Sequence, residues 1–374
     1  MYAAENHIQL LKNNLSNEVW ESGCEWVWQQ IFPLSMDLTG KHSNQTLQTQ
    51  KKWSSINTMD PAYDQYEKAR EFYRTHEYLA WIGEDESDEE TIRSASEEAL
   101  DQSENANSPA NTDSASAKIS DQPMIYPMQQ LMDYDFLMKH FYNVHTSTTA
   151  DRELMNAKNL LSKDLTLEKE DAPQILIYHT HSQESYKNSK TDENVVAVGQ
   201  KLTDLLTEKG WNVYHDTTVY DLAGGKLDRS RAYTYALEGI NEILARYPSI
   251  RVVLDIHRDG VGEDVYLKTE IGGQPSARIM FFNGLSQTPE GPISYLANPF
   301  REDNLAFSLK LQLKAEEYYP GFTRKIYLKG LRYNQHLRAR SALVEVGAQT
   351  NTFEEACNAM MPLAELLDMV LQGK

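Results

Sequence analysis

Residues 175–186 of this 374-residue chain are Ile-Leu-Ile-Tyr-His-Thr-His-Ser-Gln-Glu-Ser-Tyr. The first four form a short continuous apolar run, which is typical of a strand that is buried on both faces. Two histidines and a glutamate follow it directly. Ligands of open parallel sheets bind beyond the carboxyl ends of the strands, so functional side chains are expected here.

Strand and helix patterns alternate from this point to the C-terminus. The expected strands after the first lie at 211–214, 251–256, 277–282 and 341–346, and the expected helices at 194–209, 231–247, 303–319 and 353–371, the last with a kink at Pro362. Strands that alternate with helices of this length are typical of βα units. The sequence therefore predicts an α/β domain over 173–374, with a largely parallel sheet flanked by helices.

The part of the chain before this domain has a different character. Residues 1–83 are rich in tryptophan and tyrosine near helical spacing, which favours a small helical packing module; a peptide or glycan groove lined by these aromatics is the alternative. Residues 84–121 hold twelve acids, two bases and no aromatic side chain, which predicts a disordered acidic linker. The apolar pattern resumes over 122–172, a short ordered lead-in.

Overall composition excludes several classes of function. The formal net charge is -19, which argues against a non-specific nucleic-acid binder, because such proteins need excess Lys and Arg. No run of about 18 apolar residues is present to span a bilayer as a helix, and no signal peptide is apparent. Cys24 and Cys357 are too few and too distant for a disulfide scaffold or a CxxC metal motif.

Three predicted strands bring residues of metal-ligand type to one edge of the sheet. His181 and Glu184 follow the first strand, His257 directly follows the strand at 251–256, and Glu345 lies inside the last strand. Two imidazoles and a carboxylate fit a catalytic zinc site, which has three N/O ligands and one open position. The further carboxylate would take a proton from water.

Other roles for these residues remain open. His179 shares a face with His181 if the strand continues, so it could bind the metal or support a ligand. Glu345 could instead pair with Arg338 or Arg340. Arg258 could steady the substrate or Glu345, or make an ion pair within the fold.

Competing chemistries lack their motifs. The chain has no GxSxG nucleophile elbow and no P-loop. Cys357 stands beside Ala356 in a predicted helix, where packing is the expected role.

Three ordered motifs carry a resemblance to a known family. Residues 175–186, Asp-Ile-His-Arg-Asp-Gly at 255–260 and Leu-Val-Glu-Val-Gly-Ala-Gln-Thr-Asn-Thr at 343–352 resemble the stage II sporulation protein P family of endospore-forming bacteria. The resemblance covers the chain from about Met132 to the C-terminus.

The resemblance implies a cell-wall hydrolase related to zinc-dependent N-acetylmuramoyl-L-alanine amidases of α/β fold. His181 and His257 match the two zinc histidines and Glu345 the catalytic glutamate. Glu184 fits the motif of the carboxylate ligand, whereas Glu193 stands where the related amidases place theirs. Cleavage of a stem-peptide cross-link by the same site, or wall binding without turnover, are the alternative functions.

The resemblance also implies partners and a location. The implied partners are peptidoglycan and the stage II sporulation proteins D and M, which together remodel the wall during engulfment. The family normally carries an N-terminal membrane anchor, which this chain does not show. The expected location is therefore the cell envelope, on the wall side of a membrane if an anchor is missing from this chain.

Overall fold

The computed structural model describes residues 123–223 and 226–374. The helical region expected over 1–83 and the acidic linker expected over 84–121 lie outside the described residues, so both stay predictions.

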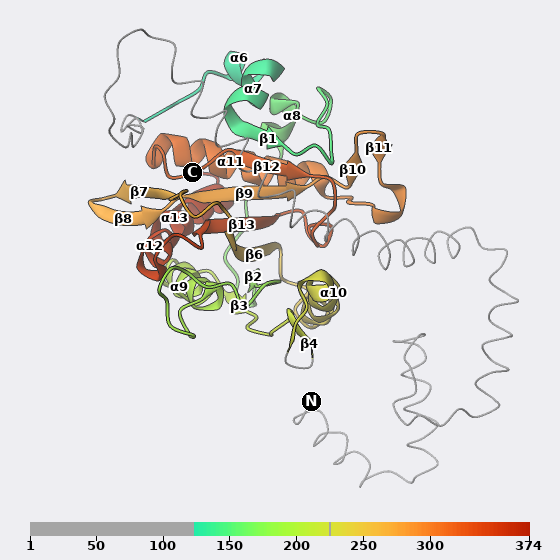
Figure 1. Cartoon of the computed structure of the whole chain (residues 1–374). Helices are drawn as coiled ribbons and strands as arrows, with labels where there is room; N and C mark the ends of the chain where they lie inside the picture. Colours follow the sequence, from blue (N-terminus) through green and yellow to red (C-terminus); the bar gives the residue numbers. More distant parts are fainter. Residues whose placement is uncertain (1–122, 224–225) are drawn as a thin grey trace, which may run out of the picture. The chain divides into compact units, whose positions relative to one another are not determined.

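A seven-stranded sheet organises the described part of the chain (Figure 1). Its strands, in spatial order, are β1 (Tyr142–Val144), β12 (Ile326–Lys329), β9 (Ile279–Gly284), β13 (Ser341–Ala348), β6 (Val252–Asp259), β2 (Ile175–Tyr178) and β3 (Val213–His215). All neighbours pair in parallel except β9 and β13, which are antiparallel. The expectation of a largely parallel sheet flanked by helices is confirmed.

The single antiparallel pair determines which residues share an edge. The carboxyl ends of β2, β3, β6 and β13 lie at one end of the sheet, and the amino ends of β9, β12 and β1 lie at that same end. The segment expected as a lead-in, 122–172, contributes β1, the edge strand next to β12.

Helices cover both faces of the sheet. The described helices are α6 (Met128–Leu131), α7 (Tyr134–Phe141), α8 (Ala157–Ser162), α9 (Val195–Glu208), α10 (Arg229–Arg246), α11 (Arg301–Tyr318), α12 (Phe353–Asn358), α13 (Met360–Gln372) and the 3-10 turn η2 (Ser294–Leu296). Three short hairpins complete the fold: β4 (Leu222–Ala223) with β5 (Lys226–Leu227), β7 (Lys268–Ile271) with β8 (Gln274–Ala277), and β10 (Gln287–Thr288) with β11 (Gly291–Pro292).

Alternating side chains of β2 show how the two faces are filled. Ile175 and Ile177 enter the large core that also contains apolar residues of α9, α11 and α13. Leu176 and Tyr178 enter a smaller core on the other face, against α10. Both sets are buried, which is why the sequence of this strand is apolar throughout.

Local signals fix the ends of the helices that flank the site. Asn194 begins α9, because its side-chain oxygen accepts hydrogen bonds from the backbone N–H of Val196 and Ala197. The expected break of the last helix is present, but it falls at Ala359, between α12 and α13. Pro362 lies in the first turn of α13, where a missing N–H costs no helical hydrogen bond.

No helix within 123–223 or 226–374 is long and apolar enough to cross a membrane.

Candidate active site

Three adjacent strands place the predicted site residues at one edge of the sheet. Strand β6 lies between β2 and β13, with Tyr178 opposite Asp255 and His257 opposite Glu345. Partners in register point to the same face, so His257 and Glu345 are neighbours. The structure thus brings together the residues that the sequence could place only at the same edge.

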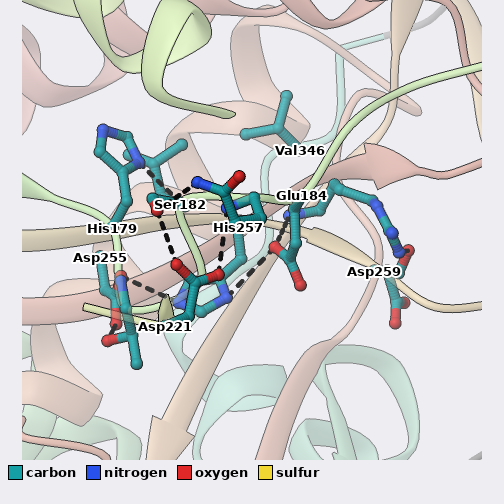
Figure 2. Close-up of polar contacts among 12 residues, drawn as sticks. His179, Ser182, Glu184, Asp221, Asp255, His257, Asp259 and Val346 are labelled. Carbon is teal, nitrogen blue, oxygen red and sulfur yellow. Dashed lines mark hydrogen bonds and ion pairs between the residues drawn. The ribbon is translucent and has the colours of Figure 1, made fainter. Parts of the chain in front are cut away.

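His257 is a buried imidazole held between two carboxylates (Figure 2). Its Nδ1 lies 3.4 Å from Glu184 Oε2, and its Nε2 lies 2.9 Å from Asp255 Oδ1. Burial alone would lower the pKa of His257, but Asp255 and Glu184 outweigh it and hold the pKa well above its ordinary value. The surroundings of this ring therefore stabilise positive charge.

His181 is the second imidazole of the cluster. Its ring stands edge-on to that of His257, with ring centroids 5.2 Å apart, and packs against Tyr233 of α10 at 5.6 Å. Burial, followed by the charge of His257, lowers the pKa of His181 to about 3. The neutral ring is the form that binds a metal.

Glu184 is the carboxylate that the structure places beside these rings. Its Oε1 lies 2.8 Å from Arg229 Nη2, and its Oε2 accepts a hydrogen bond from the Arg258 backbone N–H at 3.1 Å. Burial opposes ionisation, but contact with His257 outweighs it and holds the pKa of Glu184 below its usual range. Glu184 is therefore an ionised, oriented anion.

Glu193, the alternative carboxylate ligand, makes different contacts. Its side chain forms an ion pair with Lys190 at 2.8 Å and accepts a hydrogen bond from the Lys190 backbone N–H. Only Glu184 of the two contacts a histidine of the cluster in this structure.

Glu345 has the environment of a base rather than that of an ion pair. Its Oε2 is shielded from solvent and has no hydrogen-bond partner among the described residues. Burial, and then the charge of Asp259, raise the pKa of Glu345 to about 8. Arg338 and Arg340, its suggested partners, bond instead to backbone carbonyls, those of Ile250, Leu337, Leu165 and Thr166.

Arg258 and His179 support the backbone of the site. Arg258 donates through its guanidinium to the backbone carbonyls of Ser185 and Asp259. His179 is fully buried, with Nδ1 3.0 Å from the Ile256 carbonyl and Nε2 2.9 Å from His215 Nε2.

Sequence reasoning missed three residues that orient the cluster. Arg229, at the start of α10, pairs with Glu184, and nothing in its local sequence indicated this. Asp221 accepts hydrogen bonds from Ser182 Oγ and the Gln183 N–H, in the turn that carries His181 and Glu184. Asp255 orients His257, and a carboxylate inside an apolar strand was a usable signal.

The donor types fit zinc, although the side chains do not surround a common point where a metal ion could bind. His181, Glu184 and His257 are the ligand types of a catalytic zinc site, and Asp255 backs His257 as carboxylates back metal-binding histidines. Glu184 is turned toward Arg229, and within the described ranges no three His, Cys, Asp or Glu side chains stand ready to hold a metal ion. A bound zinc would take the place of the positive charge that the carboxylates favour at His257.

Comparisons with known proteins identify a family. The model of the family stage II sporulation protein P matches residues 57–368. The stage II sporulation protein P of Bacillus subtilis (strain 168) is 28% identical over 214 residues, which cover 52% of this chain and 50% of that protein. The chain thus spans about half the length of this curated relative.

Two solved structures are also similar. One is the CwlD amidase from Clostridioides difficile in complex with the GerS lipoprotein, with 16% identity, a TM-score of 0.34 and coverage of 52% of this chain and 99% of that chain. The other is the N-acetylmuramyl-L-alanine amidase Ami1 from Mycobacterium abscessus, with 14% identity, a TM-score of 0.30 and coverage of 54% and 97%.

Proposed function

The chain belongs to the stage II sporulation protein P family, and on that premise we propose that it is a peptidoglycan hydrolase which cleaves the N-acetylmuramoyl-L-alanine amide bond during sporulation. The observation that carries the proposal is the cluster of His181, Glu184 and His257 beside Glu345, at the edge where β2, β6 and β13 end. It combines a metal-type donor set with a carboxylate of raised pKa, the two elements that amide hydrolysis needs.

The proposed cofactor is Zn²⁺, held by His181, Glu184 and His257. Zinc bound there would polarise the scissile carbonyl and make water a better nucleophile. Asp255, 2.9 Å from Nε2 of His257, would support this ring from the side away from the metal. Glu184 would turn from Arg229 toward the histidines when zinc binds.

Glu345 carries the proton transfers in this proposal. The raised pKa of Glu345 lies near the working pH, which suits a group that accepts a proton and later returns it. It takes the proton of the attacking water at Oε2, the oxygen without a hydrogen-bond partner in the described part of the chain. It then donates this proton to the amine of the leaving L-alanine.

Family membership supports the remaining proposals on partners and location. The proposed partners are peptidoglycan and the stage II sporulation proteins D and M. The proposed location is the cell envelope, on the wall side of a membrane. Co-purification of the full chain with tagged protein D or M from sporulating cells tests the first, and fractionation of the same cells tests the second.

Labelling of newly exposed amino groups tests the proposed activity. Purified peptidoglycan is digested with the full chain plus zinc, and new N-termini are labelled and identified. Cleavage of the proposed bond exposes the amino group of L-alanine. New amino groups on cross-linking residues alone would identify a cross-link endopeptidase, and no new amino groups would identify a wall-binding protein without turnover.

A further inference from the structure

A pocket of about 460 Å³ lies next to the cluster and takes no part in the proposed chemistry. Its wall includes Ser182 and Gln183, which stand between His181 and Glu184 in the chain. The rest of the lining comes from the turn before α9, the first turns of α9, the last residue of β3 and the segment after it. The volume is in the usual range of ligand sites, so a substrate held at the cluster would have this space beside it.

One lining residue of the pocket belongs to a fixed imidazole pair. His215 lines the pocket, with Nε2 2.9 Å from His179 Nε2 and Nδ1 3.0 Å from Gln200 Oε1. A methyl group at Gly199 of α9 would lie 2.5 Å from His179 Cε1. Glycine at this position therefore lets α9 approach the pair, and the packing of α9 holds His215 in place beside the pocket.

The wall shared with the cluster is equally fixed. Asp221, which is fully buried, accepts hydrogen bonds from Ser182 Oγ at 2.7 Å and from the Gln183 N–H at 3.1 Å. Figure 2 shows Asp221 and Ser182 on one side of His257 and Asp259 on the other. The same turn thus carries the pocket wall and two of the proposed zinc ligands.

The two sides of the cluster differ in charge. The pocket lining contains amides, hydroxyls, an imidazole and small apolar side chains, and its one charged member is Asp192. The buried Asp216 follows His215 directly. On the other side Arg258 is the next-to-last residue of β6, and Arg324, which precedes β12, pairs with Asp259. The described pocket lining thus holds no Lys or Arg, whereas the opposite side holds Arg258, whose guanidinium donates to backbone carbonyls, and Arg324, which pairs with Asp259.

The two halves of peptidoglycan differ in the same way. The stem peptide carries carboxylates, whereas the glycan presents uncharged hydroxyl and acetamido groups to the amides and hydroxyls of such a pocket. We propose that the pocket lined by His215 binds the N-acetylglucosamine next to the muramoyl sugar of the glycan, with the stem peptide directed toward Arg258 and Arg324. This assignment rests on the proposed function and adds the direction in which the substrate lies.

The test fills the pocket from its rim and compares two substrates. Val219 lines the pocket and is 46% exposed in a loop, so Val219→Trp in the full chain adds bulk without disturbing the core. The substrates are a muramoyl peptide with one sugar and the same peptide on an N-acetylglucosaminyl-muramoyl disaccharide. The ratio of kcat/KM, disaccharide over monosaccharide, should fall about tenfold in the variant.

Matched variants make the result specific. Val144→Trp makes the same change at a valine that is 40% exposed on β1, the far edge strand, and should keep the wild-type ratio. Thr217→Trp, at a second exposed lining residue, should reproduce the fall. An unchanged ratio in both pocket variants would overturn the assignment.

Direct binding separates this assignment from the proposed activity. An N-acetylglucosamine disaccharide and a free stem peptide are each titrated into the full chain and into Val219→Trp. Loss of disaccharide binding alone supports the pocket as a glycan site, even if wild-type protein cleaves neither substrate and the proposed function fails. Loss of stem-peptide binding alone would contradict the assignment while leaving the activity intact.

Discussion

Glu345 lies beside His257. Its Oε2 is shielded from solvent and has no hydrogen-bond partner among the described residues. In Glu345→Gln the shape remains and the basicity is lost. We expect the variant to fold, to keep zinc, and to lose about 10²–10⁴-fold in turnover, the usual effect of removing a general acid–base. Thermal melting, zinc content and amide cleavage are measured on one preparation. Near-normal cleavage by a stable, zinc-loaded variant would exclude Glu345 as the base.

His257 is the residue that tests the metal assignment. His257→Ala removes one of three proposed ligands and leaves the carboxylates of Asp255 and Glu184 without the positive charge between them. We expect stoichiometric zinc to disappear, as measured by elemental analysis after dialysis. Arg258→Gln, a change at the adjacent residue, is the control and should keep zinc, because the Arg258 contact to Glu184 is through the backbone N–H. One zinc per chain in His257→Ala would contradict the assignment.

His336 links the stability of the fold to pH. Burial, and then the charge of Arg332, lower the pKa of His336 to about 3, so the folded chain keeps this ring neutral. Below pH 6.5 the unfolded chain binds a proton there that the folded chain does not, and stability falls as pH falls. When the pH falls from 7 to 5, the unfolding free energy of wild type should fall by about 1–2 kcal/mol more than that of His336→Gln. Denaturant titrations at both values measure this; equal losses would contradict the prediction.

Part of the candidate site could be predicted from the sequence. His181, Glu184, His257 and Glu345 were predictable because each follows or interrupts an apolar strand. The Arg229–Glu184 pair was not, because the two residues are 45 positions apart and meet only after α10 packs on the sheet. The local sequence also could not show whether Glu184 or Glu193 faces the histidines, because this depends on how the loop before α9 turns.

At the scale of elements, α9 depends on its glycine. Gly199→Ala would place a methyl group 2.5 Å from His179 Cε1 and 3.1 Å from His215 Nε2. Overpacking of this kind costs about 1–3 kcal/mol, more than the helix propensity that alanine adds. We expect a lower melting temperature for Gly199→Ala, whereas Lys201→Ala, at an exposed position of the same helix, should change it little. A more stable Gly199→Ala protein would contradict the predicted clash.

The long helices of the domain were predictable, whereas two of its short strands were not. The structure has helices α9, α10 and α11 within a few residues of the expected ranges. Helices α9 and α10 have sustained apolar periodicity, whereas α11 is buried on most sides and was marked by its length and by Pro320 and Gly321 at its end. Strands β1 and β12, of three and four residues, lack the continuous apolar run that marked β2. The direction of β9 depends on its connection, since the β7–β8 hairpin rather than a helix follows β6, and the chain therefore starts β9 at the edge where β6 ends.

At the scale of the whole molecule, one segment outside the described residues is strongly acidic. Residues 84–121 hold twelve of the 55 acids and contain no candidate site residue. We expect a chain that lacks 84–121 to cleave soluble wall fragments at the wild-type rate. Initial rates on such fragments, with circular dichroism as the folding control, measure this. A correctly folded deletion variant without turnover would show that the segment contributes to catalysis.

The central claim is that this chain, through Glu345 and the adjacent histidine cluster, cleaves the bond between muramic acid and L-alanine. Mass spectrometry of purified peptidoglycan digested with zinc-loaded wild-type chain, beside Glu345→Gln, tests it most directly. The predicted products are glycan strands without peptide and free stem peptides that begin with L-alanine, both absent with Glu345→Gln. Stem peptides that stay attached to muramic acid while their cross-links are cut, or products that are the same with both proteins, would contradict it.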